Sequence, residues 1–375
     1  MQAYILRGAQ VYDGQGFAEK EVYTAKGVFT DSPREGAQVI DCAGRRLIPG
    51  LLDIHTHGAN GVDANDVTEE KIEQILSFTA SQGVSGQLLS VLTDTPEQTL
   101  RCIRTIVRAM KRCPQLMGIH LEGPFLASDY KGAMPEHLLR EGDPALLREY
   151  QKAAEGNIRY LTVSPEVKGT ESVIEAAKEL GIVVAIGHSG ADYDTAMRAI
   201  DLGAASITHT FNAMKLLHQH FPAILGAALE SDAYCEMICD GRHLHPGIVR
   251  LLLKCKGVSR CIAVTDSIMA AGLPDGSYKL GVNDVTVKEG DALLTSTGVR
   301  AGSTLTSLTA LRNLMRFTGR SMAELLPVLT ENPAALLRLN KGAIAPGKDA
   351  DCVLLSAADE ADLTFSRGRL VCQRT

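Results

Sequence analysis

The sequence predicts an α/β protein in which a (β/α)8 TIM barrel carries a small β-sandwich domain formed from the N- and C-terminal segments. Three observations support this fold class. The chain has 375 residues, 45% of them hydrophobic and 22% charged, which is enough to bury a large core. Strand-like runs alternate with helix-like runs through the middle of the chain. Both ends consist of short strands separated by turns.

The two ends, residues 1–49 and 343–375, are predicted to pair into the small domain. Short strands are expected at 3–6, 10–12, 21–24, 28–29 and 38–40, and again at 351–355, 363–365 and 369–372. Asp13-Gly14 and Lys26-Gly27 are turn signals between the first of these strands. Because the N-terminal segment alone is too short to bury a core, we expect its strands to pack with those of the C-terminal segment.

Residues 50–342 are predicted to form the barrel and to carry the catalytic site. Eight buried strands are expected at 47–57, 86–92, 116–122, 158–163, 183–188, 206–211, 236–240 and 261–266. Helical runs such as 98–111, 171–180 and 191–202 separate most of them. A doubly wound open sheet is the alternative, but no Gly-x-Gly-x-x-Gly motif follows the first strand. The segment 278–295 interrupts the last unit and is predicted to be an inserted hairpin.

Charge and cysteine content restrict the partners and the compartment. The 38 Lys and Arg residues against 44 Asp and Glu give a net charge of −6, and no long basic run occurs, so neither nucleic acid nor a membrane is expected as a partner. The nine cysteines lie mostly in apolar runs, which is typical of reduced thiols. Since no leader-like or membrane-spanning segment is recognisable, we predict a cytoplasmic location.

Five of the eight predicted strands end in a potential metal ligand. The first strand carries two imidazoles two residues apart, which places both on one face of the strand. The residues at the five strand ends are His55 and His57, Glu122, His188, His209 and Asp266. Because the carboxyl ends of barrel strands meet at one rim, these groups are expected to converge, and burying them together is difficult to explain without a cation. Nitrogen and oxygen ligands without thiolate suit Zn, Fe, Mn or Co.

Several longer motifs surround these residues. They are His-Thr-His-Gly at 55–58, His-Leu-Glu-Gly-Pro-Phe at 120–125, Gly-His-Ser at 187–189, His-Thr-Phe-Asn-Ala-Met at 209–214, Asp-Gly-Arg-His at 240–243, Thr-Asp at 265–266 and Ala-Gly-Ser-Thr-Leu at 301–305. With these motifs the sequence resembles the N-acetylglucosamine-6-phosphate deacetylase family of the amidohydrolase superfamily. The resemblance extends over nearly the whole chain, including residues 342–351, and it implies hydrolysis of the acetamide of an amino-sugar phosphate.

The resemblance also implies a metal centre and a general base. Glu122, His188 and His209 would hold one divalent ion, while His55 and His57 would hold a second ion bridged by Glu122. Two ions per subunit are therefore expected. Asp266 would take a proton from the attacking water and return it to the departing amine, which is a poor leaving group unless it is protonated.

Substrate contacts are carried over from the same motifs. The expected substrate-binding residues are Ala133, Met134, Asn212, Ala213, His220, His243, Ala301, Gly302 and Ser303. A small-molecule amino sugar is thus the expected partner, and the resemblance suggests a homodimer.

Two of these positions depart from the family pattern. His220 stands where the family has an arginine that binds the 6-phosphate, and an imidazole offers less charge and fewer donors than a guanidinium. Met134 stands where relatives tend to carry a polar residue, and methionine cannot donate a hydrogen bond to a substrate. These departures keep a different N-acetyl hexosamine open as the substrate.

Two further alternatives concern the activity itself. A cyclic amide or an N-acyl amino acid is a possible substrate class on the same scaffold, although the Asn-Ala-Met segment speaks against it. A catalytically silent sugar-binding protein would be expected to have lost a ligand or the general base, and every one of these positions is filled.

Overall fold

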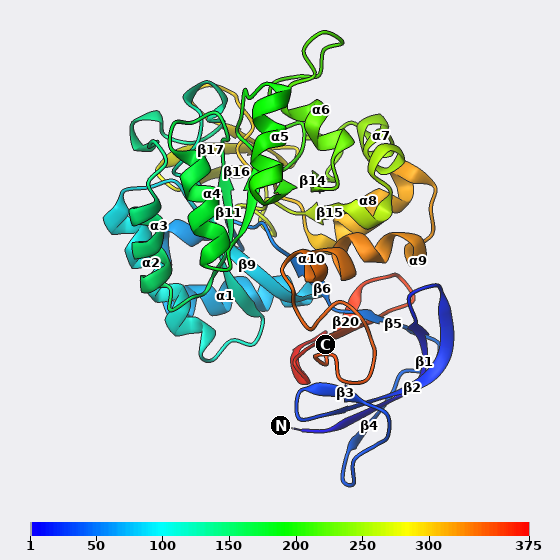
Figure 1. Cartoon of the computed structure of the whole chain (residues 1–375). Helices are drawn as coiled ribbons and strands as arrows, with labels where there is room; N and C mark the ends of the chain where they lie inside the picture. Colours follow the sequence, from blue (N-terminus) through cyan, green and yellow to red (C-terminus); the bar gives the residue numbers. More distant parts are fainter. Residues whose placement is uncertain (1, 375) are drawn as a thin grey trace.

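The computed structural model describes residues 2–374, and it contains an eight-stranded parallel barrel sheet (Figure 1). The strands follow the chain in spatial order, each hydrogen-bonded to the next. They are β6 (Leu51–Asp53), β9 (Val84–Leu92), β10 (Leu116–Glu122), β11 (Ile158–Val163), β12 (Val183–Ile186), β13 (Ala204–Ile207), β14 (Tyr234–Ile238) and β15 (Cys261–Val264). The predicted fold class is confirmed. Residues 1 and 375, the outer limits of the predicted small domain, lie outside the described residues.

The first and last barrel strands meet through the segments that follow them. The Asp266 amide donates to the His55 carbonyl at 2.8 Å, and the His57 amide donates to the Ser267 carbonyl at 2.8 Å. These bonds bring the two ends of the sheet together at the rim where the chemistry-bearing residues lie. Sequence positions more than two hundred residues apart thereby become neighbours.

Helices cover the outside of the barrel (Figure 1). They are α1 (Glu69–Ser81), α2 (Pro96–Met110), α3 (Pro144–Ala153), α4 (Thr170–Glu179), α5 (Tyr193–Leu202), α6 (Ala223–Glu230), α7 (Pro246–Lys256), α8 (Ser307–Thr318), α9 (Met322–Leu325) and α10 (Glu331–Leu336). α2 illustrates how the sequence sets such a helix. The Thr95 hydroxyl accepts from the Gln98 amide, Pro96 occupies the first turn, and Ile103 and Ile106 face the core. Its apolar stripe and capping residues agree with the predicted helix at 98–111.

The two ends of the chain form a second sheet around its own small core. Its main path runs β21 (Arg369–Gln373), β20 (Ala361–Ser366), β19 (Cys352–Leu355), β5 (Arg46–Pro49), β1 (Tyr4–Tyr12), β2 (Phe17–Ala25) and β3 (Val28–Thr30), and β4 (Gln38–Asp41) pairs with β1. The predicted strand 47–57 was wrong in its extent. The chain passes from one sheet to the other at Gly50, because β5 belongs to the small sheet and β6 belongs to the barrel. A Cβ atom at Gly50 would collide with the side chain of Ser85, so this position requires glycine.

A three-stranded antiparallel sheet is inserted after β15, where the sequence predicted a hairpin at 278–295. It consists of β16 (Gly276–Leu280), β17 (Asn283–Lys288) and β18 (Asp291–Leu294). Its apolar face packs with Leu92 at the end of β9 and with Leu126 and Met134 from the loop after β10. Because this core lies beside the barrel mouth, the insertion can contribute a wall to any site formed there. Two short strands, β7 (Gly58–Ala59) and β8 (Val62–Asp63), pair next to the first barrel strand.

Single-turn helices complete the connections. They are η1 (Ala64–Asp66), η2 (Ser128–Tyr130), η3 (Glu136–Leu138), η4 (Val258–Arg260) and η5 (Leu326–Leu329). Within residues 2–374, every helix is too short or too polar to cross a lipid bilayer.

Candidate metal centre and substrate pocket

Two groups of buried side chains converge at the carboxyl ends of the barrel strands. One group is His55, His57 and Asp266, and the other is Glu122, His188 and His209. Within each group, one potential ligand atom from every residue lies within 4.8 Å of the others. All six residues predicted as metal ligands or as the general base are therefore brought together in the structure.

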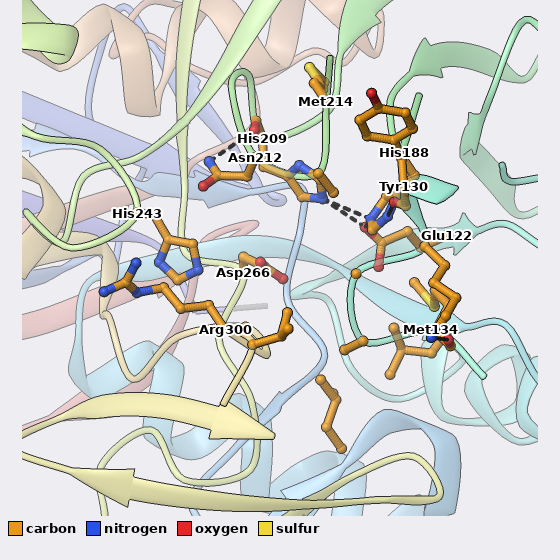
Figure 2. A pocket seen from close by; sticks show the side chains of 18 of the residues that line it. Glu122, Tyr130, Met134, His188, His209, Asn212, Met214, His243, Asp266 and Arg300 are labelled. Carbon is orange, nitrogen blue, oxygen red and sulfur yellow. Dashed lines mark hydrogen bonds and ion pairs between the residues drawn. The ribbon is translucent and has the colours of Figure 1, made fainter. Parts of the chain in front are cut away.

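Glu122 belongs to the second group and also contacts the first. Its Oε1 atom is 3.2 Å from Nε2 of both His188 and His209 (Figure 2). Its Oε2 atom is 3.2 Å from Nε2 of His57. Asp266 faces the first group, with Oδ1 at 3.2 Å from Nε2 of His57. One carboxylate thus contacts both groups, which is the position that a bridging ligand must occupy.

Three of the four histidines have their other ring nitrogen committed to a fixed acceptor. Nδ1 of His55 donates to Glu236 at 3.0 Å, Nδ1 of His57 to the Ser90 carbonyl at 3.2 Å, and Nδ1 of His188 to the Tyr130 carbonyl at 2.9 Å. A neutral imidazole that donates from Nδ1 carries its lone pair on Nε2. The lone pairs of these three rings therefore point toward the carboxylates.

This arrangement fits a divalent metal. Nε2 atoms of His55 and His57 are 3.2 Å apart, and those of His188 and His209 are 3.0 Å apart. Neutral nitrogens at these distances repel each other and the neighbouring carboxylates unless a cation lies among them. Imidazole and carboxylate donors with fixed second hydrogen bonds are typical of Zn and related metals.

The pKa values of His57 and Glu122 also indicate that positive charge is favoured at this site. Burial lowers the pKa of His57, but hydrogen bonds and charge from Asp266 and Glu122 outweigh it and raise the pKa to about 9. Burial raises the pKa of Glu122, yet the surrounding histidines hold that pKa well below its usual range. Protons can supply the missing charge, and a metal ion binding to the same nitrogens would displace them.

Asp266 follows β15 with its carboxylate held at the floor of the pocket. Burial raises the pKa of Asp266, but His55 and His57 outweigh this effect and lower it, so the carboxylate is ionised near neutral pH. Its backbone carbonyl accepts from the Ser303 amide at 2.7 Å, while the Ser303 hydroxyl donates to the Thr265 carbonyl at 2.6 Å. The predicted Ala301-Gly302-Ser303 segment therefore contacts Asp266, the predicted general base, through the backbone.

A cavity of about 780 Å³ opens above the two groups. Figure 2 shows His243 on one side of Asp266, with Glu122 and His188 on the other. The predicted site residues that line this cavity are His57, Glu122, Ala133, Met134, His188, His209, Asn212, Ala213, His243, Asp266 and Gly302. His55, Ala301 and Ser303 are buried beneath its surface. Apart from these three buried residues, the predicted catalytic, metal and substrate residues line one pocket, with one exception.

The exception is His220, which does not line the pocket. It lies exposed on the loop between β13 and α6, and it borders a separate depression with Asp192, Tyr193 and Lys215. Its backbone amide donates to Nδ1 of His218 within the same loop at 3.2 Å. Within one chain, the side chain of His220, which stands where the family has an arginine, therefore lies outside the cavity.

Comparison with known proteins relates most of the chain to one family. A model of the amidohydrolase family matches residues 46–371. An N-acetylglucosamine-6-phosphate deacetylase from Bacillus subtilis (strain 168) is 35% identical over 354 residues, which cover 92% of this chain and 89% of the relative. The chain belongs to this deacetylase family.

Other family members extend the comparison. An N-acetylgalactosamine-6-phosphate deacetylase from Escherichia coli is 30% identical over 377 residues, covering 98% of this chain and 99% of the relative. A solved structure of a mutant N-acetyl-D-glucosamine-6-phosphate deacetylase from Mycobacterium smegmatis, in complex with N-acetyl-D-glucosamine-6-phosphate, superposes with a TM-score of 0.91. That structure is 29% identical and covers 99% of both chains.

In this member of the deacetylase family, sequence reasoning missed a buried carboxylate that supports the metal centre. Glu236 on β14 accepts from Nδ1 of His55 at 3.0 Å, from the Tyr160 hydroxyl at 2.7 Å and from the His209 amide at 3.0 Å. Its only sequence signal is an acidic residue inside an apolar strand. Such a group needs buried partners, and here one of them is a proposed metal ligand.

His120, the first residue of the His-Leu-Glu-Gly-Pro-Phe motif, is buried under the same centre. Its Nδ1 atom lies 2.8 Å from the Ser90 hydroxyl, and its Nε2 atom lies 2.9 Å from the Thr162 hydroxyl. Burial, followed by the charge of His55, holds its pKa well below the usual value, so the ring stays neutral. Both nitrogens are occupied, which makes His120 a packing and orienting residue.

Sequence reasoning also missed part of the pocket wall. Tyr130, Lys131, Asp291 and Arg300 line the cavity together with the predicted residues. Asp291 and Arg300 come from the inserted sheet and the loop after it, and no motif marked them. Their approach to the barrel mouth depends on how the insertion packs.

Proposed function

We propose that this chain hydrolyses the acetamide of N-acetylglucosamine-6-phosphate to glucosamine-6-phosphate and acetate. The observation that carries this proposal is the joint presence of two metal-ligand groups, bridged by Glu122, and a buried carboxylate in a pocket large enough for a sugar. The family relatives, most of which are named for this reaction, support the same substrate class.

The proposed roles divide between the two groups. Glu122, His188 and His209 would hold one ion, and His55 and His57 would hold a second with Glu122 as the bridge. A divalent ion supplies two things when bound, a water of lowered pKa and polarisation of the amide carbonyl. We assign two ions per subunit, of Zn, Fe, Mn or Co, to these ligands.

Asp266 would move the proton. Its carboxylate is ionised, buried and directed into the cavity, so it can accept a proton from the attacking water. The same oxygen can then deliver that proton to the amide nitrogen, and the carbon–nitrogen bond breaks as a neutral amine leaves. Asn212 and His243, with the backbone at Ala213 and Gly302, would position the sugar.

The experiment is an acetate-release assay on protein of measured metal content. We expect turnover of N-acetylglucosamine-6-phosphate that falls on chelation and returns with added metal. Asp266→Asn should retain the metal and lose about a hundredfold to ten-thousandfold in kcat. An active Asp266→Asn variant, or a metal-free protein of full activity, would contradict these assignments.

A second candidate substrate is N-acetylgalactosamine-6-phosphate, because a relative that covers nearly the whole chain is named for it. The two sugars differ only in the orientation of one hydroxyl group. A panel of N-acetyl hexosamines, each with and without the 6-phosphate, decides between them, and it also tests an unphosphorylated substrate.

Further parts of the function are proposals on separate observations. We propose that residues 50–342 form the catalytic domain and that 1–49 with 343–375 form the small domain. The exposed loop residues Leu216, Leu217 and Phe221 support a homodimer, since a cluster of exposed apolar side chains is typical of a contact surface. Analytical ultracentrifugation tests the dimer.

The nine cysteines, all of which are free thiols in the described residues, support a cytoplasmic location.

A further inference from the structure

Arg300 places a guanidinium in the wall of the substrate pocket. Its Nε and Nη2 atoms donate to the two carboxylate oxygens of Asp291, each at 3.0 Å. A guanidinium has five N–H groups, so this bidentate pair leaves three of them for a ligand. The side chain remains 44% exposed although both residues line the cavity. Asp291 thus orients Arg300 while three guanidinium N–H groups remain available.

The guanidinium lies away from the proposed metal centre. Figure 2 shows Arg300 reaching toward the side of the pocket where His243 lies, with Asp266 between that side and Glu122. His243 is itself held by Asp240, whose carboxylate accepts from Nδ1 at 2.7 Å. Two side chains held by carboxylates, one imidazole and one guanidinium, therefore form the wall opposite the proposed metal ligands.

The geometry of the proposed substrate calls for a cation on that wall. In N-acetylglucosamine-6-phosphate the acetamide on C2 and the phosphate on C6 project from opposite sides of the sugar ring. When the acetamide lies at Glu122 and Asp266, the phosphate must lie toward the opposite wall. Arginine suits this anion because its planar donors match phosphate oxygens in pairs.

Other cationic residues are placed less favourably. His220 is exposed outside the cavity, as described above. Lys131 lines the cavity, and it directly follows Tyr130, whose backbone carbonyl accepts from His188. Its Nζ atom also donates to the Met134 carbonyl at 3.4 Å. Among the lining residues of the described chain, Arg300 is the only guanidinium.

We propose that Arg300, oriented by Asp291, binds the phosphate of the substrate from within the same subunit. This inference rests on the proposed function, because the position of the phosphate follows from the acetamide at the metal centre. Asp291 keeps the guanidinium against the wall and reduces the entropy lost when the phosphate binds. The inserted sheet, which carries Asp291, thereby becomes part of the specificity pocket.

The test is the phosphate preference, defined as kcat/KM for N-acetylglucosamine-6-phosphate divided by kcat/KM for N-acetylglucosamine. Arg300→Leu should lower this ratio by about tenfold to hundredfold, because a charged hydrogen-bonded pair is lost on one substrate only. Arg300→Lys should give an intermediate ratio, since it keeps the charge but not the fork. Arg108→Leu is the matched control, because Arg108 also donates from Nε to a carboxylate, Glu69, on the outer surface.

Three results would overturn the proposal. The first is a wild-type enzyme without a phosphate preference. The second is an Arg300→Leu enzyme that loses activity equally on both substrates, which indicates a structural role. The third is an unchanged ratio in Arg300→Leu with a reduced ratio in His220→Ala or Lys131→Leu.

Failure of the proposed function is distinguishable from these results. It would appear as a wild-type protein that releases acetate from no N-acetyl sugar. In that case calorimetric titration with glucosamine-6-phosphate still measures the contact, because tighter binding to the wild type than to Arg300→Leu supports the phosphate assignment. Equal affinity, or binding to neither protein, contradicts it.

Discussion

At the scale of single residues, the Nδ1 atoms of the histidines, which point away from the candidate metal centre, fix the orientation of the rings that form it. His55, His57 and His188 each donate from Nδ1 to a carboxylate or carbonyl, which sets the tautomer and aims Nε2 inward. Two of these acceptors are backbone carbonyls, so sequence cannot mark them. The third, Glu236, is a side chain whose removal is informative.

Glu236→Gln is expected to weaken metal binding at the ligand pair formed by His55 and His57. The charged acceptor raises the basicity of His55, and its loss should lower metal affinity by about tenfold to hundredfold. Competitive titration with a chelator, followed by metal analysis, measures this affinity. Tyr160→Phe is the control, because it removes a different hydrogen bond to the same carboxylate. Equal affinities in the wild type and Glu236→Gln would refute the role.

At the scale of elements, the segment after β18 supports Asp266, the proposed general base, by close backbone approach. Gly302 has φ of +62°, and a Cβ atom there would lie 2.9 Å from the Asp266 carbonyl oxygen and collide with Ile268. Two hydrogen bonds from Ser303 fix the same stretch to Thr265 and Asp266. The predicted substrate contacts at 301–303 are therefore tied to the placement of the carboxylate.

Gly302→Ala should reduce activity more than an alanine at another left-handed glycine does. A left-handed non-glycine residue costs about 1–2 kcal/mol wherever it occurs. Gly181, with φ of +72° and open space around its Cβ position, offers the matched control. We expect Gly302→Ala to lose more stability than Gly181→Ala in urea denaturation, because only its Cβ atom collides with Ile268 and the Asp266 carbonyl. Gly302→Ala alone should lose at least about tenfold in kcat/KM, because a shift of Asp266 that costs about 1.4 kcal/mol in the transition state gives that loss. Similar activities would contradict this account.

At the scale of the whole molecule, a buried ion pair joins the end of the barrel to the small sheet. Lys341, which follows α10, pairs with Asp351 at the start of β19 and lies 3.2 Å from Asp349. Asp351 also accepts from the Arg367 amide at 2.6 Å. Burial raises the pKa of Asp351, while Lys341 opposes this shift. The lysine therefore stabilises a charge that the interior disfavours.

Lys341→Met should destabilise the protein by about 3–5 kcal/mol, since it leaves a buried carboxylate unpaired. Removing the lysine raises the folded-state pKa of Asp351 further, so the cost should be largest at neutral pH and smaller at mildly acidic pH, where the carboxyl is protonated. Urea denaturation at both pH values measures the difference. The exposed pair of Lys20 and Asp13 is the control, and Lys20→Met should have little effect at either pH. A cost independent of pH would contradict the prediction.

The sequence by itself determined the barrel, the small domain built from both ends, and the residues at the carboxyl ends of the strands. Apolar periodicity and strand-end ligands are local signals, and closure of a parallel barrel brings such ends to one rim whatever the loops do. His55, Glu122, His188, His209 and Asp266 could therefore be predicted to meet.

Only the tertiary structure decided which other residues join them. Glu236 reaches His55 across the barrel, and Arg300 reaches the pocket through the packing of the inserted sheet. His220 lies on an exposed loop outside the pocket, although it stands where the family has a substrate-binding arginine. Each outcome depends on contacts between positions far apart in the chain. Local pattern carries no information about such contacts, because they are set by how whole elements pack.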